Sequence, residues 1–311
     1  MKAVVLNDWG GVENFAIQDV PKPSIQPDQV LVQVKAFGVN PADFKTRTGS
    51  TPYSKNYTHP IILGWDIAGE VIEVGTEVTS FKPGDAVYGM VNFPEPGNAY
   101  AEYVASPAAH LALKPAQLTF EEAAAAPLAV LTAWQGLTEH GQLKAGEKVL
   151  IQAASGGVGH LAVQLAKALG AHVIGTASGK NEAFVRTLGT DEFIDYTTTN
   201  VETAVIDADL VFDTAGADTI FSSAKVLKPN GRLISIAYSA MDKVLAVRSD
   251  IHAERILVHT SGNDLAIINQ LIADGKLKIE VNEVLPAEKI GDAHHRLESR
   301  RTTGKIVLTF E

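Results

Sequence analysis

The pattern of hydrophobic and polar positions changes near residue 120 of this 311-residue chain. Before that point, residues 30–36 and 68–74 alternate between apolar and polar side chains, which predicts half-buried strands. The run Lys82-Pro83-Gly84-Asp85 predicts a turn that leads into another strand at 86–88. Nine of the 14 prolines lie in the first hundred residues, and proline is excluded from helix interiors and central strands. The first third is therefore expected to be rich in turns and short strands.

After residue 120, strands and helices alternate. Thr119 and Glu122 have the spacing of a capping box, and the alanine-rich run that follows predicts a helix. Further helices are predicted at 157–169 and near 265–273, and strands at 149–153, 173–176, 192–194, 208–213, 232–236 and 305–310. Strands separated by helices predict a parallel sheet covered by helices on both faces. We therefore predict an α/β fold with a β-rich domain at 1–121, completed by 262–311, and a doubly wound domain at 122–261.

A glycine-rich turn between the predicted strand at 149–153 and its helix is the segment most informative about chemistry. Residues 154–159 read Ala-Ser-Gly-Gly-Val-Gly, which is the dinucleotide fingerprint with alanine in its first position. Gly156 would let the backbone approach a pyrophosphate, and Gly159 would let the helix pack close to the strand. Free N–H groups at the helix start would then bind the anion. We predict that the cofactor is bound by Ser155, Gly156, Gly157 and Val158.

Two other interpretations of this turn stay open. In the first, it is a tight turn that binds no ligand. In the second, Ala153-x-Ser155-x-Gly157 is a variant nucleophile elbow, which also lies between a strand and a helix. A hydrolase with Ser155 as nucleophile would need an acid and a histidine after later strands, and His252 or His259 could nominally serve.

The residues after the second strand of this domain favour NADP(H) over NAD(H). An NAD site needs Asp or Glu at this point, about 20 residues after the glycine turn, to hold the ribose diol. Residues 176–180 read Thr-Ala-Ser-Gly-Lys, and the first acid is Glu182. Because a hydroxyl and an ammonium suit a 2′-phosphate, we predict Ser178 and Lys180 as its ligands. The alternative for Lys180 is a solvated loop lysine.

Composition excludes several classes of function. The 26 Lys plus Arg and 36 Asp plus Glu give a net charge of −10, and no run of five or more charges has one sign, which argues against a nucleic-acid partner that needs a dense basic face. The absence of cysteine excludes disulfides, thiol nucleophiles and cysteine zinc sites, and it fits a reducing compartment. The longest uncharged run, residues 149–166, contains Gln152, Ser155, His160, Gln164 and three glycines, unlike the roughly 20 mostly apolar residues of a membrane span, and the chain start lacks a secretory core. We expect a soluble, cytoplasmic protein with no membrane partner.

Seven segments in a fixed order resemble one family. They are residues 40–45, 63–69, 82–85, 99–103, 153–159, 194–196 and 304–308, the first reading Asn-Pro-Ala-Asp-Phe-Lys. On these segments the chain resembles, over essentially its whole length, the zinc-independent quinone oxidoreductase branch of the medium-chain dehydrogenase/reductases. The resemblance implies a GroES-like domain, a Rossmann domain, an active site in the cleft between them, NADPH and often a homodimer. It implies hydride transfer to a small-molecule quinone or α,β-unsaturated carbonyl, with residues 40–45 and 128–133 closer to the enone and alkenal reductases.

The chain departs from the zinc alcohol dehydrogenases of the same superfamily, which hold catalytic zinc with Cys, a His-Glu pair and a further Cys or acid. The corresponding stretches here read Gly38-Val39-Asn40 and Gly64-Trp65-Asp66, without Cys or His. The four-cysteine structural lobe is missing too, and the nine histidines form no His-Glu-x-x-His motif. We therefore predict that the protein uses no metal.

Without a metal, another group must stabilise the negative charge that develops on the substrate oxygen, and a positioned donor can contribute about 3–4 kcal/mol. We name Asn40 and Lys45, on one short segment expected to face the cleft, and Tyr53 as proton donor. Alternatives stay open: Asn40 fixing its loop or meeting the nicotinamide ribose, Lys45 as a surface lysine, and Tyr57 or solvent as the proton source. Trp65 and Phe44 are candidates for an apolar substrate wall or for simple packing.

The resemblance also implies cofactor contacts at five further residues. Thr132 would lie near the nicotinamide, Tyr196 beside the adenine or its phosphate, and the carboxamide would be recognised around Ala237, Tyr238 and Ser261. Thr132 bonding its own helix backbone and Tyr196 packing at a strand end are the structural alternatives. For the whole chain, the alternative to an NADPH-dependent reductase is an NADPH-binding redox sensor or structural protein without turnover.

Overall fold

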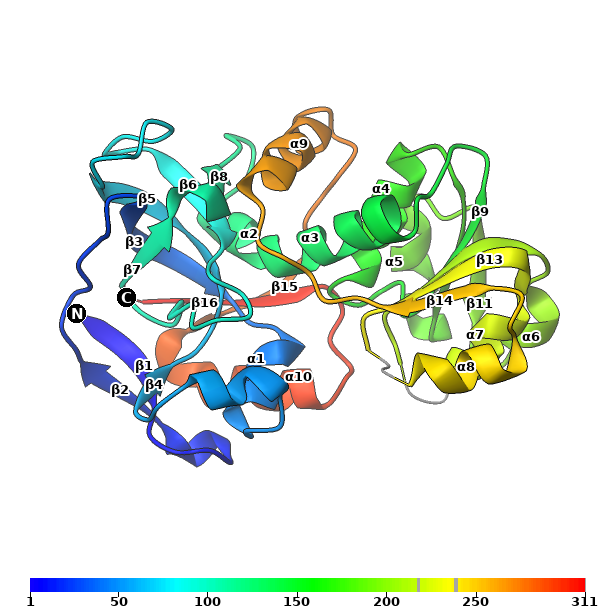
Figure 1. Cartoon of the computed structure of the whole chain (residues 1–311), viewed down its shortest axis with the longest axis horizontal. Helices are drawn as coiled ribbons and strands as arrows, with labels where there is room; N and C mark the ends of the chain where they lie inside the picture. The colour runs from blue at the N-terminus through cyan, green and yellow to red at the C-terminus, as the bar shows by residue number, and fades with distance from the viewer. Residues whose placement is uncertain (217–218, 238–239, 311) are drawn as a thin grey trace. The chain divides into compact units, whose positions relative to one another are not determined.

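The computed structural model describes residues 1–216, 219–237 and 240–310. Contacts between backbone positions divide it into two compact units (Figure 1). Unit 1 comprises Met1–Leu131, His259–Asp274 and Ile279–Glu311, and unit 2 comprises Thr132–Val258 and Gly275–Lys278. Among the described residues, no helix is both long and apolar enough to cross a bilayer.

Unit 1 is built on a seven-stranded sheet in the order β15-β16-β3-β5-β6-β8, with β7 also paired to β3. Its strands are β3 (Gln29–Gly38), β5 (Asp66–Val74), β6 (Ala86–Met90), β7 (Tyr103–Pro107), β8 (Leu111–Leu113), β15 (Val281–Pro286) and β16 (Lys305–Thr309). The last strand, β16, pairs antiparallel with the end of β3, where Val307 lies opposite Gly38. The C-terminal segment therefore completes the sheet that the first third of the chain begins (Figure 1).

A smaller sheet and several helices complete unit 1. The sheet has the order β2-β1-β4, with bounds Lys2–Leu6 for β1, Phe15–Asp19 for β2 and Ile61–Ile62 for β4. The α-helices are α1 (Pro41–Arg47), α2 (Phe120–Ala125), α9 (Gly262–Ala273) and α10 (Ile290–Glu298), and the 3₁₀ helices are η1 (Val12–Asn14), η2 (Pro52–Asn56), η3 (Ala108–His110) and η6 (Ala287–Lys289). Helix α2 packs so tightly on β3 that a side chain at Gly38 would meet the carbonyl oxygen of Ala124 at 2.4 Å.

Unit 2 is a six-stranded sheet in which every pair is parallel, as predicted. Its order is β11-β10-β9-β12-β13-β14, with bounds Lys148–Ile151 for β9, His172–Ala177 for β10, Glu192–Asp195 for β11, Ala208–Asp213 for β12, Leu227–Ser235 for β13 and His252–Arg255 for β14. Its helices are α4 (Gly159–Ala168), α5 (Glu182–Thr187), α6 (Val201–Ala204), α7 (Thr219–Lys225) and α8 (Met241–Val247), with a 3₁₀ turn η5 (Gly179–Asn181) and a π-helical turn η4 (Gly136–His140).

The strand order of unit 2 reverses between β9 and β12. From β9 the chain moves outward through β10 to β11, and from β12 it moves the opposite way through β13 to β14. Because parallel crossovers are right-handed, the two directions place their helices on opposite faces of the sheet. Helix α4 accordingly packs on β9 and β10, and α7 on β12 and β13 (Figure 1). In such sheets, ligands bind at the carboxyl ends of the strands near the reversal point.

Two predicted elements differ from the structure for local reasons. The capping box is confirmed, since the Thr119 hydroxyl accepts a hydrogen bond from the Glu122 N–H and the Glu122 carboxylate accepts one from the Thr119 N–H. The helix it starts is nevertheless interrupted, because α2 ends at Ala125 and α3 (Pro127–Gln135) begins at a proline that cannot continue a preceding helix. The predicted helix at 157–169 begins at Gly159, because the glycine turn takes up two more residues.

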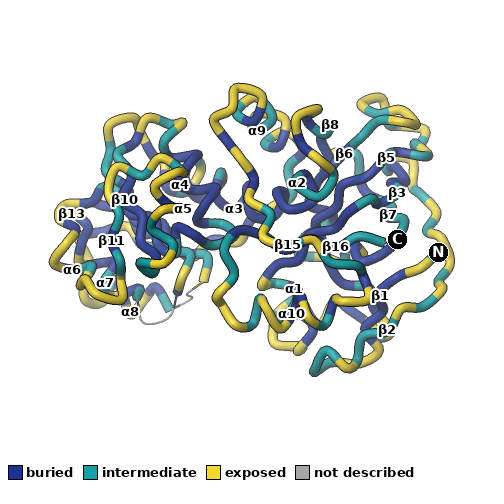
Figure 2. The backbone as a smooth tube through the Cα atoms, turned by 180° about the vertical axis from the view of Figure 1, so that it is seen from behind, coloured by how far each residue is buried: buried dark blue, intermediate teal, exposed yellow. Residues whose placement is uncertain are grey.

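Burial follows the strands of both units (Figure 2). The largest fully buried side chains of unit 1 include Trp65, Tyr88 and Tyr100, and Phe212 on β12 is their counterpart in unit 2. Unit 1 also buries an unusual group of polar side chains, among them Asn40, Asp43, Asp66 and Lys305. Burying charge is costly unless it is paired, so these residues are described with the candidate site.

Candidate functional site

The glycine turn of unit 2 lies at the reversal point of its sheet, directly after β9. Its strand is anchored on both sides, since the Gln152 N–H donates to the Phe212 carbonyl at 3.1 Å and the Ala154 N–H donates to the Thr176 carbonyl at 2.8 Å. The turn ends in α4, and the first N–H groups of a helix have no partners within it, although the His160 N–H already donates to the Gly156 carbonyl at 3.0 Å. Ser155, Gly156, Gly157 and Val158 therefore lie where a pyrophosphate would meet both the turn and the positive end of a helix.

Close packing in this turn explains its glycines. A Cβ atom at Gly159 would lie 2.1 Å from the Ala153 carbonyl oxygen, and one at Gly156 would lie 3.2 Å from the same oxygen. Ala153 itself has a φ of 49°, in the left-handed region that L-residues rarely adopt. The backbone thus bends sharply between β9 and α4, as the fingerprint predicts, and the absence of side chains keeps the approach to Gly156 open.

The predicted ligands of the adenosine end follow neighbouring parallel strands. Ser178 and Lys180 follow β10, and Tyr196 follows β11. Because the carboxyl ends of parallel strands meet at one edge of a sheet, these residues share an edge with the glycine turn. Lys180 is exposed, and 59% of Tyr196 is exposed, so both side chains are accessible to a ligand.

One hydrogen bond ties the first two of these loops together. The side-chain amide of Asn181 donates to the Ser155 hydroxyl, with 3.0 Å between Nδ2 and Oγ. The partner of Ser155 is thus an amide, which cannot serve as the general base that a nucleophilic serine requires. The imidazole of His252, one candidate base, lies 3.5 Å from Glu254 on β14. This geometry weighs against the hydrolase interpretation.

The remaining predicted cofactor contacts are distributed over both units. Ala237 follows β13 and is exposed, whereas Tyr238 lies outside the described residues. Thr132 is buried in α3, at the first position of unit 2. Ser261 belongs to unit 1, where its hydroxyl caps α9 by accepting a hydrogen bond from the Asp264 N–H at 3.0 Å.

In unit 1, three buried polar side chains from distant parts of the sequence meet around Asn40. The Asn40 amide donates to Asp66 Oδ2 at 2.8 Å, and its carbonyl oxygen accepts a hydrogen bond from the Lys305 ammonium. The ammonium also donates to the Val39 carbonyl at 3.1 Å and lies 3.9 Å from Asp66 Oδ2. Asp66 Oδ1 accepts from the Leu128 N–H at 2.8 Å. We call Asn40, Asp66 and Lys305 the Lys305 cluster.

A second buried carboxylate, Asp43, lies beside this cluster. Its Oδ2 accepts a hydrogen bond from the Asn40 N–H at 2.6 Å at the start of α1. Burial raises the pKa of Asp43 to about 7, although the Asn40 N–H and the Tyr100 hydroxyl both lower it. The Tyr100 hydroxyl lies 3.2 Å from Nε2 of His294, whose pKa is lowered to about 3, first by burial and then by the nearby Arg47.

The charges of these groups depend on one another. Burial raises the pKa of Asp66 to about 6, against the opposing effects of the Lys305 ammonium, the Asn40 amide and the Leu128 N–H. Burial also lowers the pKa of Lys305, against Asp66 and Asp43. One ammonium is thus close to two carboxyl groups. Asp66, Lys305 and Asp43 together carry no net charge when Asp66 is ionised, Lys305 is charged and Asp43 holds a proton.

The other two predicted catalytic residues lie on α1 and η2 of unit 1. Lys45 is exposed on α1. Tyr53 is half-buried, and its ring packs edge-on against Trp65, at 6.0 Å between ring centroids, and against Phe93, at 5.7 Å. Trp65 is fully buried and donates its indole N–H to the Glu95 carbonyl at 2.8 Å, so it packs beneath Tyr53.

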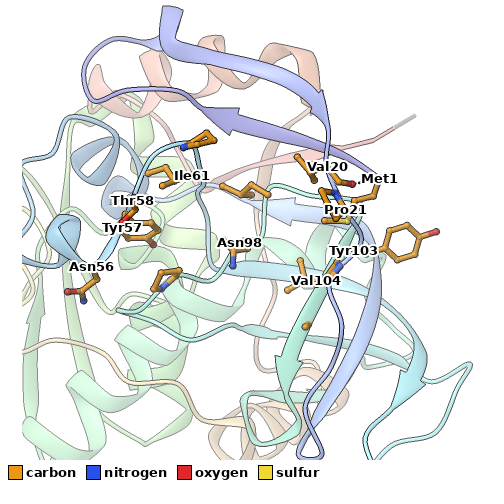
Figure 3. A pocket seen from close by; sticks show the side chains of 15 residues that line it. Met1, Val20, Pro21, Asn56, Tyr57, Thr58, Ile61, Asn98, Tyr103 and Val104 are labelled. Carbon is orange, nitrogen blue, oxygen red and sulfur yellow. Dashed lines mark hydrogen bonds between the residues drawn. The ribbon is translucent and has the colours of Figure 1, made fainter.

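A pocket of about 370 Å³ opens elsewhere on unit 1 (Figure 3). It is lined mostly by apolar and proline side chains around Met1, Val20, Tyr57 and Val104. Asn40, Lys45 and Tyr53 are not among its lining residues. The hydroxyl of Tyr57 is buried and has no hydrogen-bond partner among the described residues. The pocket is thus separate from the Lys305 cluster.

The sequence alone did not identify the hydrogen-bond partners of two predicted site residues. These partners are Asp66 and Lys305, which bond to Asn40, and Asn181, which bonds to Ser155. Asp66 and Lys305 lie in segments that resemble the family, yet the sequence assigns them no role, and no sequence pattern indicates Asn181. A usable signal was present, because both Asp66 and Lys305 are charged residues next to strand segments of apolar character. A charge in such a position needs a partner.

Comparisons with known proteins agree over the whole chain. Residues 26–116 match the family described as alcohol dehydrogenase GroES-like domain, and residues 188–308 match zinc-binding dehydrogenase. A chloroplastic NADPH-dependent alkenal/one oxidoreductase of Arabidopsis thaliana is 35% identical over 99% of this chain and 79% of its own length. A 2-methylene-furan-3-one reductase of Solanum lycopersicum is likewise 35% identical over 99% of this chain and 79% of its own length.

Solved structures give the same result. The quinone oxidoreductase of Coxiella burnetii has 35% sequence identity and a TM-score of 0.94, covering 100% of this chain and 99% of its own. The Escherichia coli quinone oxidoreductase complexed with NADPH has 28% identity and a TM-score of 0.89, covering 99% of this chain and 100% of its own. These matches confirm the predicted GroES-like domain and Rossmann domain.

The residues of unit 1 do not fit a catalytic zinc ion. Zinc in proteins is held by Cys, His and carboxylate ligands, and the two stretches that correspond to the zinc-binding ones contain Asn40, Trp65 and Asp66. The Trp65 indole is fully buried and bonded to Glu95. Asp66, the one carboxylate of the set, already has its oxygens engaged by Asn40 and Leu128, and the Lys305 ammonium lies beside it. A divalent cation there would be repelled by this ammonium.

Proposed function

We propose that this chain, which belongs to the zinc-independent quinone oxidoreductase branch of the medium-chain dehydrogenase/reductase superfamily, reduces a quinone or an α,β-unsaturated carbonyl compound with NADPH. The observation that carries the proposal is the glycine turn at the reversal point of a parallel sheet, in a chain similar to an NADPH-dependent alkenal/one oxidoreductase and to a quinone oxidoreductase complexed with NADPH. The bound cofactor supplies a hydride, and the substrate accepts it together with a proton.

The chain's own residues would bind the cofactor at the carboxyl edge of unit 2. Ser155, Gly156, Gly157 and Val158 would hold the pyrophosphate, and Ser178 with Lys180 would hold the 2′-phosphate. Tyr196 would lie against the adenine. Thr132, Ala237, Tyr238 and Ser261 would contact the nicotinamide end. Support comes from the position of the first three groups after β9, β10 and β11 and from the absence of an acid between Thr176 and Lys180.

The catalytic residues would come from the GroES-like domain. Lys45 would donate to the substrate oxygen as negative charge develops there, which a positioned donor stabilises by about 3–4 kcal/mol. Asn40 would act beside it, and Tyr53 would deliver the proton. The supporting observations are that Lys45 is exposed on the helix that Asn40 begins and that Tyr53 packs on the rigid Trp65 ring.

Domain organisation, assembly and location extend the proposal. The catalytic domain would comprise 1–121 with 262–311, and the Rossmann domain would comprise 122–261. The protein would be a cytoplasmic homodimer. Strand β14 supports the dimer, because it is an edge strand followed by Leu257, of which 49% is exposed. The lack of cysteine fits a reducing compartment.

The experiment that tests the function starts from purified, metal-stripped protein. It is titrated with NADPH and NADH while nicotinamide fluorescence is followed, and then phenanthrenequinone and a simple enone are added. We expect tight NADPH binding and loss of the reduced-nicotinamide absorbance, and the faster acceptor identifies the substrate class. Binding without oxidation by any acceptor on a broad panel would support a redox sensor instead. Binding of neither nucleotide would overturn the assignment of the glycine turn.

A further inference from the structure

The Lys305 cluster joins three segments that lie far apart in the sequence. Asn40 precedes α1, Asp66 begins β5 and Lys305 begins β16. All three side chains are almost completely buried, with exposed fractions of 1% for Asn40, 0% for Asp66 and 4% for Lys305. Burying an ammonium group costs free energy. We therefore expect this cation to have a role that an apolar side chain of the same size could not perform.

The chemistry of the cluster fixes the Asn40 amide in one orientation. An ammonium only donates hydrogen bonds, and a carboxylate only accepts them. The Asn40 oxygen must therefore face Lys305 and its nitrogen must face Asp66, as observed. If the amide turned over, two donors would meet at Lys305 and two acceptors would meet at Asp66. Lys305 and Asp66 together thus hold Asn40 from both sides.

The position of this ammonium is informative. It contacts Val39 and Asn40 on one side and lies near Asp66 on the other. These residues belong to the two stretches that correspond to the metal-binding ones of the zinc alcohol dehydrogenases. The Lys305 side chain therefore places a positive charge between these two stretches.

We propose that Lys305 is a built-in cation of the catalytic domain, which takes the place of a metal ion and is a positioning residue for Asn40 and for the start of α1. The proposal rests on the proposed function, because Asn40 and Lys45 of α1 are both assigned there to the catalytic residues. The ammonium fixes the Asn40 side chain, and the Asn40 N–H binds Asp43 at the first turn of the same helix. Loss of the cation would therefore displace the start of α1 rather than remove a group that touches the substrate.

The first test substitutes Lys305→Met, which keeps the length of the side chain and removes the charge. We expect kcat with the better acceptor to fall about 100-fold, as misplacement of catalytic groups by about 1 Å can cause, with little change in the Kd for NADPH. The control is Lys35→Met, because Lys35 lies on the same sheet but is only partly buried and is paired with Glu70. An unchanged kcat for Lys305→Met would overturn the proposal.

A double variant separates positioning from the cost of an unpaired buried carboxylate. Lys305→Met with Asp66→Asn removes both charges and should recover thermal stability relative to Lys305→Met. It should stay slow, because neither neighbour then dictates the orientation of the Asn40 amide. Recovery of wild-type kcat in the double variant would show that no cation is needed.

Chemical rescue tests the cation without relying on turnover. Lys305→Ala leaves space for a small alkylammonium ion, and propylammonium should raise its melting temperature and kcat while propanol should not. Equal effects of both compounds would overturn the proposal, because packing alone would then explain the role of Lys305. If the wild-type protein reduces no acceptor, the proposed function fails, and the melting temperature still decides whether a cation is required here.

Discussion

The side-chain amide of Asn181 and the hydroxyl of Ser155 are 3.0 Å apart and join two loops that leave neighbouring parallel strands. One loop carries the glycine turn and the other carries Ser178 and Lys180. If a dinucleotide spans both loops as proposed, this bond fixes the spacing of the groups proposed to bind its pyrophosphate and its 2′-phosphate. Asn181 thus links the two loops that we propose form one cofactor site.

Removing this link should weaken cofactor binding. A neutral hydrogen bond contributes about 0.5–1.5 kcal/mol, so Asn181→Ala should raise the Kd for NADPH roughly 2- to 12-fold, measured by nicotinamide fluorescence. Ser155→Ala should have a similar effect and should keep most of the reductase activity. Complete loss of activity in Ser155→Ala with unchanged NADPH affinity would instead support the hydrolase interpretation.

Lys180 should determine the preference for NADPH over NADH. A charge-assisted hydrogen bond to the 2′-phosphate is worth about 1.5–3 kcal/mol, so Lys180→Ala should lower kcat/KM for NADPH roughly 10- to 150-fold. The value for NADH should stay nearly constant because NADH has no 2′-phosphate. Lys144→Ala, at another exposed lysine of unit 2, is the control. Equal losses with both nucleotides would remove Lys180 from the phosphate site.

Gly159→Ala should disturb both stability and cofactor binding. The new Cβ would lie 2.1 Å from the Ala153 carbonyl oxygen, so β9 and α4 must move apart. Overpacking of this kind costs about 1–3 kcal/mol in the free energy of unfolding, and chemical denaturation measures it. Gly291→Ala on α10 is the control, since its new Cβ would meet Val12 at an ordinary 3.4 Å. Wild-type stability and NADPH affinity in Gly159→Ala would contradict this packing.

Asp43 should make stability fall as the pH rises. Its pKa is about 7 in the folded state and 3.8 ordinarily, so between these values the folded protein binds a proton that the unfolded chain has released. This extra proton stabilises the folded state. Its contribution to the free energy of unfolding is fully present below the ordinary pKa of 3.8 and is lost as the pH rises through the folded-state pKa of about 7. At about 1.4 kcal/mol per pKa unit, the effect has a ceiling of about 4 kcal/mol.

The measurement compares wild type with Asp43→Asn across this pH window. Asparagine does not titrate, yet its oxygen can still accept from the Asn40 N–H, so the stability advantage of wild type should shrink with rising pH. His294, with a lowered pKa of about 3, acts in the opposite direction in both proteins and is removed by the comparison. Parallel stability curves for the two proteins would show that Asp43 is ionised throughout.

The proposed homodimer predicts a solution mass twice that of one chain. Leu257→Glu next to the β14 edge should shift the sedimentation coefficient toward the monomer, because a charge would be buried in the interface. Ile206→Glu, at a residue of unit 2 that is 67% exposed, is the matched control and should remain dimeric. A monomeric wild-type protein would refute the dimer, and a dimer that both variants leave intact would place its interface elsewhere.

The local features of this protein were determined by its sequence. Alternation of β9, α4 and β10 follows from periodic apolar positions, and the capping box at Thr119 depends on residues three positions apart. The glycine turn is equally local, because its chemistry lies within Ala153 to Gly159. The prediction of a parallel sheet and a dinucleotide site needed only such short-range patterns.

The tertiary structure alone decided the partners of the buried polar groups. Lys305 and Asn40 are separated by 265 positions in the sequence, and Asp66 is 26 positions from Asn40. Their contact depends on β16 pairing with β3, and β3 with β5, which no periodicity specifies. The Asn181–Ser155 bond likewise depends on the order of β9 and β10 in the sheet. Short-range sequence patterns determine where helices, strands and turns form. Hydrogen bonds and ion pairs instead form between side chains that become neighbours only in the folded chain.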